Sequence, residues 1–131
     1  MIRMLDTNIC SYLLRERSAH VLQRFRDLPI DHIAISAVVA AELRFGVAKR
    51  RASTLERTLE HFLAGLRTLP WPVAAAAHYA ELRADLELRG TPIGGMDLLI
   101  AAHALAEDAI LVTNNTREFE RVRGLRLENW G

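Results

Sequence analysis

The sequence has 131 residues, of which 50% are hydrophobic and 25% are charged, and its formal net charge at pH 7 is +1. This composition excludes a disordered chain, and the length suits one globular domain that buries roughly 68 % of the surface of its unfolded form. The small net charge does not by itself predict a nucleic-acid-binding protein, although sixteen of the seventeen basic residues are arginine.

The single cysteine and the N-terminal residues indicate the cellular compartment of the protein. Cys10 has no partner for an internal disulfide, and its place in an apolar helix pattern favours a buried side chain over a nucleophile. Arg3 and Asp6 interrupt the apolar N-terminus, and no run of about 18 apolar residues follows. We therefore expect no export signal and no membrane span, and we interpret residues 1–131 as one cytoplasmic domain.

Short apolar runs alternate with helical patterns along the chain, which predicts an α/β domain with a mainly parallel sheet. The predicted strands are Ile2–Leu5, His32–Ile35, Ile110–Thr113 and, more weakly, Leu125–Leu127. The predicted helices are Ile9–Leu14, Ala19–Arg26, Ala37–Lys49, Thr54–Leu66, Val73–Leu88 and Met96–Ala106. The helix-breaking segments at 69–72 and 89–95 are too short to be domain linkers.

Asp6 follows the first predicted strand directly, in the segment MLDTN at positions 4–8. The carboxyl ends of parallel strands face the ligand crevice of an open α/β sheet, so Asp6 is a candidate functional side chain. Thr7 and Asn8 are then expected to cap the following helix. The alternative is that Asp6 itself is only a capping or turn residue.

Glu42 interrupts the apolar face of the helix that is predicted to begin after Ser36, its expected N-cap. An unpaired buried carboxylate costs several kcal/mol, so this position requires a cation or a hydrogen-bonded network. The alternative is that Glu42 lies at the edge of the face, beside Arg44 or Arg50.

Asp97 and Asn115 complete the set of candidate residues. Asp97 lies on the inward face of the first turn of a predicted helix. Its alternative role is the N-cap of that helix. No capping box supports this alternative, because the residue three positions later is Ile100. Asn115 follows a strand and offers a neutral oxygen or a hydrogen bond to water. Its alternative role is to tolerate a left-handed turn.

If Asp6, Glu42 and Asp97 converge, their mutual repulsion raises at least one pKa, and a hard divalent cation such as Mg²⁺ relieves it. An open acidic site of this kind suits the hydrolysis of phosphodiesters. The sequence has no zinc pattern, Walker loop, GxGxxG or GxSxG motif. We place His103 on a helix flank and His32 at the start of a strand, and assign neither to catalysis.

Four segments, in this order, resemble the PIN-domain ribonucleases and, more narrowly, the VapC toxins of bacterial VapBC toxin–antitoxin modules. They are LDTN at 5–8, ISAVVAAEL at 35–43, GGMDLLIAAHAL at 94–105 and LVTNNTREFERV at 111–122, and the resemblance extends to GLRLENW at 124–130. It implies a PIN-like three-layer α/β/α sandwich with a mainly parallel central sheet.

The resemblance also implies a set of metal-binding residues. Asp6 and Asp97 would be the principal ligands of Mg²⁺ or Mn²⁺, and Glu42 would hold metal-bound water or a second metal. The fourth acidic position falls on Asn115, so a second metal would bind weakly or only together with RNA. Glu118 and Glu120 could compensate, but solvation at the surface is the simpler role.

In the family pattern three hydroxyl residues orient the acids by hydrogen bonds: Thr7, Ser36 and Thr113. The substrate would be RNA, and the VapC resemblance implies tRNA, including initiator tRNA, cut in its anticodon region. No residue here selects that substrate. Basic residues must offset the repulsion between RNA and acids. The candidates are Arg44, Lys49, Arg50, Arg51, Arg117, Arg121, Arg123 and Arg126, and ordinary solvated surface is their alternative role.

The implied partners are a VapB antitoxin, a second copy of the toxin in a homodimer, and operator DNA bound only through the antitoxin. A groove for the antitoxin could be lined by Leu13, Leu14, Val21, Leu22 and Phe25, with core packing as the alternative.

Two other functions remain open at this point. A haloacid-dehalogenase-type phosphatase also begins with Asp at a strand end, but Asn8 stands where its second aspartate is expected. The other function is that of a PIN-like module that binds RNA or protein without cleaving RNA.

Overall fold

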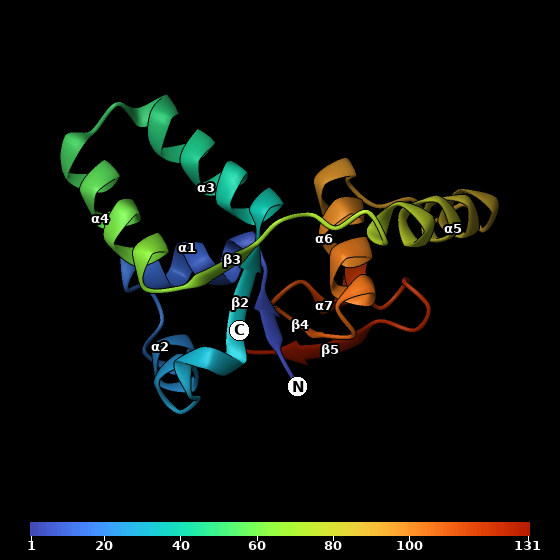
Figure 1. Ribbon diagram of the computed structural model, residues 1–131, viewed down its shortest axis with the longest axis horizontal. Helices are drawn as coiled ribbons and strands as arrows, with labels where there is room; N and C mark the ends of the chain where they lie inside the picture. The colour runs from blue at the N-terminus through green and yellow to red at the C-terminus, as the bar shows by residue number, and fades with distance from the viewer.

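The computed structural model describes residues 1–131 and has alternating strands and helices around one sheet (Figure 1). The strands are β1 Arg3–Leu5, β2 Ile33–Ser36, β3 Arg67–Leu69, β4 Ile110–Thr113 and β5 Arg126–Asn129. The helices are α1 Thr7–Arg15, α2 Ala19–Arg26, the 3-10 helix η1 Ile30–His32, α3 Ala37–Arg50, α4 Ser53–Ala64, α5 Ala75–Leu88, α6 Gly95–Ala106 and α7 Thr116–Phe119.

The sheet has the strand order β3-β2-β1-β4-β5, and every neighbouring pair is parallel. The expected α/β fold with a mainly parallel sheet is therefore confirmed. β1 and β4 are flanked by helices and buried at most positions, as their apolar sequences predicted. β3 was not predicted, because it is a three-residue edge strand whose Arg67 and Thr68 are exposed, so it carries no apolar run.

The helices form two groups on either side of the strands. In Figure 1 α1, α2, α3 and α4 lie to the left of β1 and β2, where α1 packs against the other three, and α5, α6 and α7 lie to the right. Met4, Leu5 and Ile35 from the sheet are buried with Ile9 of α1 and Ile100 of α6. Two apolar layers of helix thus cover one sheet, as the three-layer expectation required.

All six predicted helices are confirmed, and α2 matches its predicted bounds. The helix after β4, α7, was not predicted because its four residues are too few to show helical periodicity. Cys10 is fully buried as expected, and burial raises the pKa of its thiol well above the ordinary range. No helix combines the length and the apolar character that crossing a membrane requires.

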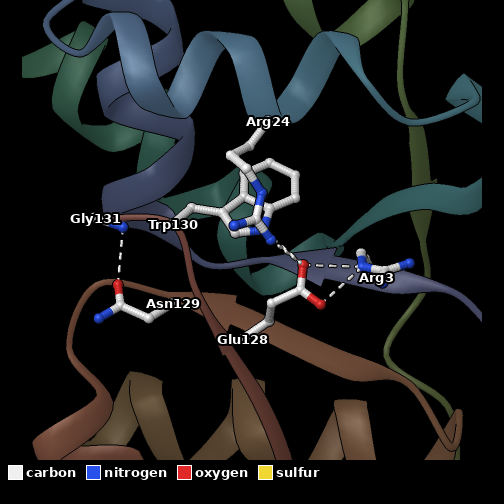
Figure 2. A network of polar contacts seen from close by, with 6 residues as sticks. All are labelled: Arg3, Arg24, Glu128, Asn129, Trp130 and Gly131. Carbon is white, nitrogen blue, oxygen red and sulfur yellow. Dashed lines mark hydrogen bonds and ion pairs between the residues drawn. The ribbon is translucent and has the colours of Figure 1, made fainter.

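Glu128 anchors the C-terminal strand to the rest of the fold. Its carboxylate accepts hydrogen bonds from Nε of Arg3 at 3.0 and 3.1 Å, from Nη2 of Arg24 at 3.0 Å and from Nε1 of Trp130 at 2.7 Å (Figure 2). The Arg24 guanidinium also lies 5.6 Å from the centroid of the fully buried Trp130 ring. This network joins β1, α2 and β5, although the residues are up to 125 positions apart in the chain.

Candidate active site

The candidate residues gather at the carboxyl edge of the sheet. Asp6 follows β1, and Asn115 follows β4 after one residue. The strand order changes direction at β1, because β2 and β4 lie on its two sides. This point between β1 and β4 is where open α/β sheets bind their ligands.

Asp6 is only 4% exposed and is itself the N-cap of α1. Its Oδ1 accepts a hydrogen bond of 2.9 Å from the backbone N–H of Ile9, so the expectation that Thr7 and Asn8 are the caps was wrong. Burial raises the pKa of Asp6, and the nearby charge of Glu42 adds to the rise, while hydrogen bonds from Thr113 and from backbone N–H groups oppose it. Asp6 therefore caps α1 and also belongs to the candidate site.

Glu42 turns toward the site rather than toward a basic residue. Its Oε1 accepts a hydrogen bond of 2.6 Å from Oγ1 of Thr7, which ties α3 to the start of α1. Arg44 forms an ion pair with Glu60 on α4 and not with Glu42. The alternative that Glu42 lies at the edge beside Arg44 was therefore wrong. The apolar face of α3 thus carries Glu42 into a hydrogen-bonded network.

Asp97 lies in the first turn of α6, whose N-cap is Gly94 and not Asp97. The pKa of Asp97 is raised to about 7, first by burial, then by a hydrogen bond with Glu118 and by the negative charges of Glu118, Glu42 and Asp6. Two carboxyl groups can share such a hydrogen bond only when one of them is protonated. Asp97 is therefore harder to ionise than an ordinary aspartate.

Glu118, which the sequence suggested as a compensating acid but favoured as solvated surface, lies at the site. Its Oε1 accepts a hydrogen bond of 3.1 Å from the N–H of Gly94, and its Oε2 accepts one of 2.7 Å from Nδ2 of Asn115. It is partly buried, so its expected role as solvated surface was wrong, whereas Glu120 is exposed as expected. Asn115 is the N-cap of α7, and Glu118 lies three positions later. This capping-box spacing was the signal in the sequence that could have identified Glu118.

Asn115 does not adopt the left-handed conformation of the alternative interpretation, since its φ is −104°. Its backbone N–H donates to Oγ1 of Thr113 at 2.8 Å, and its side-chain amide donates to Glu118. Thr113 in turn bonds to Asp6. Asn115 and Thr113 thus connect Asp6 with Glu118.

Ser36 forms hydrogen bonds with Val38 and His103 and not with an acid of the site. Its Oγ accepts a hydrogen bond of 3.1 Å from the N–H of Val38, which confirms it as the N-cap of α3, and it lies 2.7 Å from Nδ1 of His103. His103 is fully buried, so its expected place on a helix flank was wrong. The pair joins α6, which carries Asp97, to the start of α3, which carries Glu42.

A cavity of about 230 Å³ lies between the candidate residues. Its lining is almost entirely polar and consists of Asp6, Thr7, Asn8, Glu42, Asp97, Asn115 and Phe119. The structure thus brings together all four of the predicted site residues. No group of three His, Cys, Asp or Glu side chains is arranged to hold a metal ion as it stands. Water or substrate oxygens would have to complete a coordination shell.

The predicted RNA contacts are distributed over several surfaces. Arg50, Arg51 and Arg117 are exposed and form no ion pair. Lys49 lies 5.6 Å from the Phe45 ring centroid. The remaining candidates have protein partners: Arg44 with Glu60, Arg121 with the carbonyl of Pro92, Arg123 with Asp85 and Arg126 with Asp108.

The apolar residues expected to line an antitoxin groove divide into two groups. Leu13 and Val21 are buried in the core, which supports the alternative of core packing for them. Leu14, Leu22 and Phe25 are partly buried against the core, and Leu14 also lines a groove beside α1.

Comparison with known proteins identifies the family. Residues 3–125 match the family model described as the PIN domain. Ribonuclease VapC2 of Rickettsia felis is 44% identical over 132 residues, covering 99% of this chain and 98% of the relative. The tRNA(fMet)-specific endonuclease VapC of Shigella flexneri is 44% identical over 130 residues, covering 97% of this chain and 96% of the relative.

Solved structures agree with these matches. A chain in the crystal structure of VapBC2 from Rickettsia felis bound to promoter DNA has a TM-score of 0.93 and 42% identity, with 100% of both chains covered. A chain in the DNA-bound VapBC of Salmonella typhimurium has a TM-score of 0.89 and 38% identity, covering 100% of this chain and 99% of that chain. This chain therefore belongs to the PIN-domain family and, within it, to the VapC ribonucleases.

Proposed function

We propose that this protein is the toxin of a VapBC toxin–antitoxin module and an endoribonuclease that hydrolyses RNA phosphodiester bonds with Mg²⁺ or Mn²⁺. The observation that carries the proposal is the acidic cavity at the carboxyl edge of the sheet, where Asp6, Glu42 and Asp97 line one space. The family assignment removes the phosphatase alternative, whose second aspartate is replaced by Asn8.

The donor set of the cavity fits a hard divalent cation. Asp6, Glu42, Asp97 and Asn115 offer only carboxylate and amide oxygens. Burial and the neighbouring negative charges raise the pKa of Asp97, so a cation held among these groups would relieve their repulsion. Asp6 and Asp97 would hold the ion, and Glu42 would hold its water. Bound there, the ion supplies charge stabilisation at the phosphate and lowers the pKa of water.

The residues around the acids keep this arrangement in place. Thr7 fixes one oxygen of Glu42, and Asn115 fixes one oxygen of Glu118. Glu118 lies beside Asp97, and its hydrogen bond and negative charge add to the burial that raises the pKa of Asp97 to about 7. We expect water to attack the phosphate in line with the leaving oxygen, without a covalent enzyme intermediate.

We further propose initiator tRNA, cut in its anticodon region, as the substrate. Support comes from the relatives of Shigella flexneri and Salmonella typhimurium, which are named tRNA(fMet)-specific endonucleases and are 44% and 40% identical to this chain. A tRNA substrate would place the reaction in the cytoplasm. Arg50, Arg51 and Arg117 are the exposed predicted RNA contacts that have neither an ion pair nor a cation–π contact.

The proposed protein partners are a VapB antitoxin and a second copy of the toxin. The similar structures from Rickettsia felis and Salmonella typhimurium are VapBC complexes bound to DNA, which supports an antitoxin partner and operator DNA bound through it. The antitoxin would cover the partly buried side chains of Leu14, Leu22 and Phe25 on α1 and α2 and approach the acidic cavity with a basic residue.

The test is cleavage of total tRNA by antitoxin-free protein with Mg²⁺ or Mn²⁺, with EDTA and Asp97→Asn as controls and with fragment ends mapped. We expect discrete cuts in initiator tRNA that require metal and disappear in the variant. If folded, metal-bound protein makes no cut in any RNA, the alternative of a PIN-like binding module without turnover replaces this proposal.

A further inference from the structure

A groove of about 170 Å³ adjoins the acidic cavity, because Thr7, Asn8 and Glu42 line both spaces. The groove runs between α1 and the α3–α4 pair, and Arg15 lines it as well. With a rise of about 1.5 Å per residue, Arg15 lies about 13 Å along the α1 axis from Asp6. A ligand in the acidic cavity can therefore continue along this groove toward Arg15.

Arg15 lines the groove, and two further arginines lie near it in the fold. Arg15 and Arg17 lie at the end of α1, and Arg50 is the last residue of α3. All three are exposed, and none of them forms an ion pair. Arg50 is three residues after Val47, which lines the groove, so the two side chains lie on neighbouring positions of α3. In agreement with this placement, the charges of Arg50 and Arg17 lower the pKa of Arg15. We call these three residues the arginine cluster.

The arginine cluster is not explained by the folded chain alone. Basic residues favour helix C-termini, which accounts for Arg15 and Arg50 one at a time but not for bringing them together. Seven arginines elsewhere in the chain form ion pairs with carboxylates, as Arg3 and Arg24 do with Glu128. Glu16 is next in sequence to Arg15 and Arg17 but forms an ion pair with neither. The positive charge therefore remains available to an anionic ligand.

We propose that Arg15, Arg17 and Arg50 bind backbone phosphates of the RNA on one side of the bond that is cut in the acidic cavity. This inference rests on the proposed ribonuclease function. The distance from Asp6 to Arg15 places the cluster at a phosphate separated from the scissile one. Arginine guanidinium groups match phosphate geometry, and binding there offsets the repulsion between RNA and the acids.

The lining of the groove fits the same ligand. Leu14, Leu43, Val47 and Leu55 provide apolar surface between the two charged ends, and Asn8 and Ser11 provide hydrogen-bonding groups. Base faces can pack on the apolar residues while phosphates face the arginines. An acidic peptide is the competing ligand, and the experiment below separates the two.

The experiment measures binding of fluorescently labelled initiator tRNA to the full chain by anisotropy over a range of salt concentrations. All proteins carry Asp97→Asn, so that cleavage does not interfere. Each lost phosphate contact reduces the slope of log K against log salt by about 0.7 to 0.9, so Arg15→Ala/Arg50→Ala should reduce it by about 1.4 to 1.8. Arg15→Lys/Arg50→Lys, which keeps the charges, should retain most of the slope.

The matched control is Arg26→Ala/Arg57→Ala, which removes two exposed arginines without ion pairs from α2 and α4. We expect its slope to equal that of the parent protein. If the control loses as much slope as the Arg15/Arg50 variant, general charge attraction replaces the proposed contact.

Two further results would overturn the inference. If Arg15→Ala/Arg50→Ala leaves the slope unchanged but lowers the free energy of unfolding, the cluster stabilises the helix ends. If it leaves the slope unchanged but weakens binding of an acidic antitoxin peptide, the cluster binds a protein partner. A parent protein that shows no salt-dependent RNA binding at all would contradict the proposed function itself. Failure of the inference and failure of the proposed function are therefore distinguishable.

Discussion

Thr7 donates a hydrogen bond of 2.6 Å from its Oγ1 to Oε1 of Glu42, joining the first residue of α1 to the middle of α3. The two residues are 35 positions apart in the chain. The bond leaves the other carboxylate oxygen of Glu42 to serve the cavity, so the direction of Glu42 depends on Thr7.

Thr7→Val should reduce the cleavage rate of tRNA by about tenfold, because a lost orienting hydrogen bond to a site carboxylate costs that order of activity. Thr7→Ser keeps the hydroxyl and should retain most of the rate. Single-turnover cleavage with saturating Mg²⁺ measures both variants. Equal rates for Thr7→Val and the parent protein would show that Glu42 does not need this bond.

Asp97 should make stability depend on pH. Its folded-state pKa of about 7 lies above the ordinary value of 3.8, so the folded protein binds a proton that the unfolded chain has already lost between these two values. The free energy of unfolding should therefore fall as pH rises from about 4 to 7 and level off above.

Urea denaturation without divalent metal, at about pH 5 and pH 8, measures this effect, and Asp97→Asn is its control. At pH 8 we expect the variant to be more stable than the parent protein by about 1 to 2 kcal/mol, well below the full linkage value because solvent screens this partly exposed group. A pH dependence that is the same in both proteins would assign it to other groups.

Glu118→Gln should lower the pKa of Asp97, because it removes both the shared hydrogen bond and the charge of Glu118, while burial still holds the pKa above its ordinary value. Carbon-13 NMR titration of the aspartate carboxyl groups measures the change. Glu120→Gln, at an exposed neighbouring position, is the matched control. An unaltered Asp97 titration in Glu118→Gln would contradict the hydrogen bond between the two carboxyl groups.

Glu128→Gln should lower the free energy of unfolding by about 1 to 3 kcal/mol, since it weakens charge-assisted hydrogen bonds in a partly buried network. Burial alone would raise the pKa of Glu128, but hydrogen bonds from Arg3 and Trp130 and the charges of Arg3 and Arg24 lower it. The carboxylate is therefore held in its charged form.

The control for Glu128 is Asp108→Asn, which weakens the exposed ion pair with Arg126. Asn tolerates the positive φ of 52° at this position, so the change tests the ion pair and not the backbone. It should change stability by less than about 1 kcal/mol. Equal losses in the two variants, measured by urea denaturation, would remove the special role of the Glu128 network.

The sequence by itself determined the features that depend on local order. Apolar runs and helical periodicity predicted most elements, because each strand or helix must bury one face whatever its neighbours are. The position of Asp6 after β1 and the position of Glu42 within an apolar helix face were sufficient to nominate both residues. Asp97 was nominated in the same way, from the inward face of the first turn of α6.

Only the tertiary structure decided which polar groups meet. Glu118 lies beside Asp97 because α7 packs next to the start of α6, and no sequence pattern of α7 alone indicates that contact. His103 is buried because Ser36, 67 positions away, provides a partner for its Nδ1. A charged or polar side chain is buried where a partner satisfies it, and long-range packing alone supplies these partners.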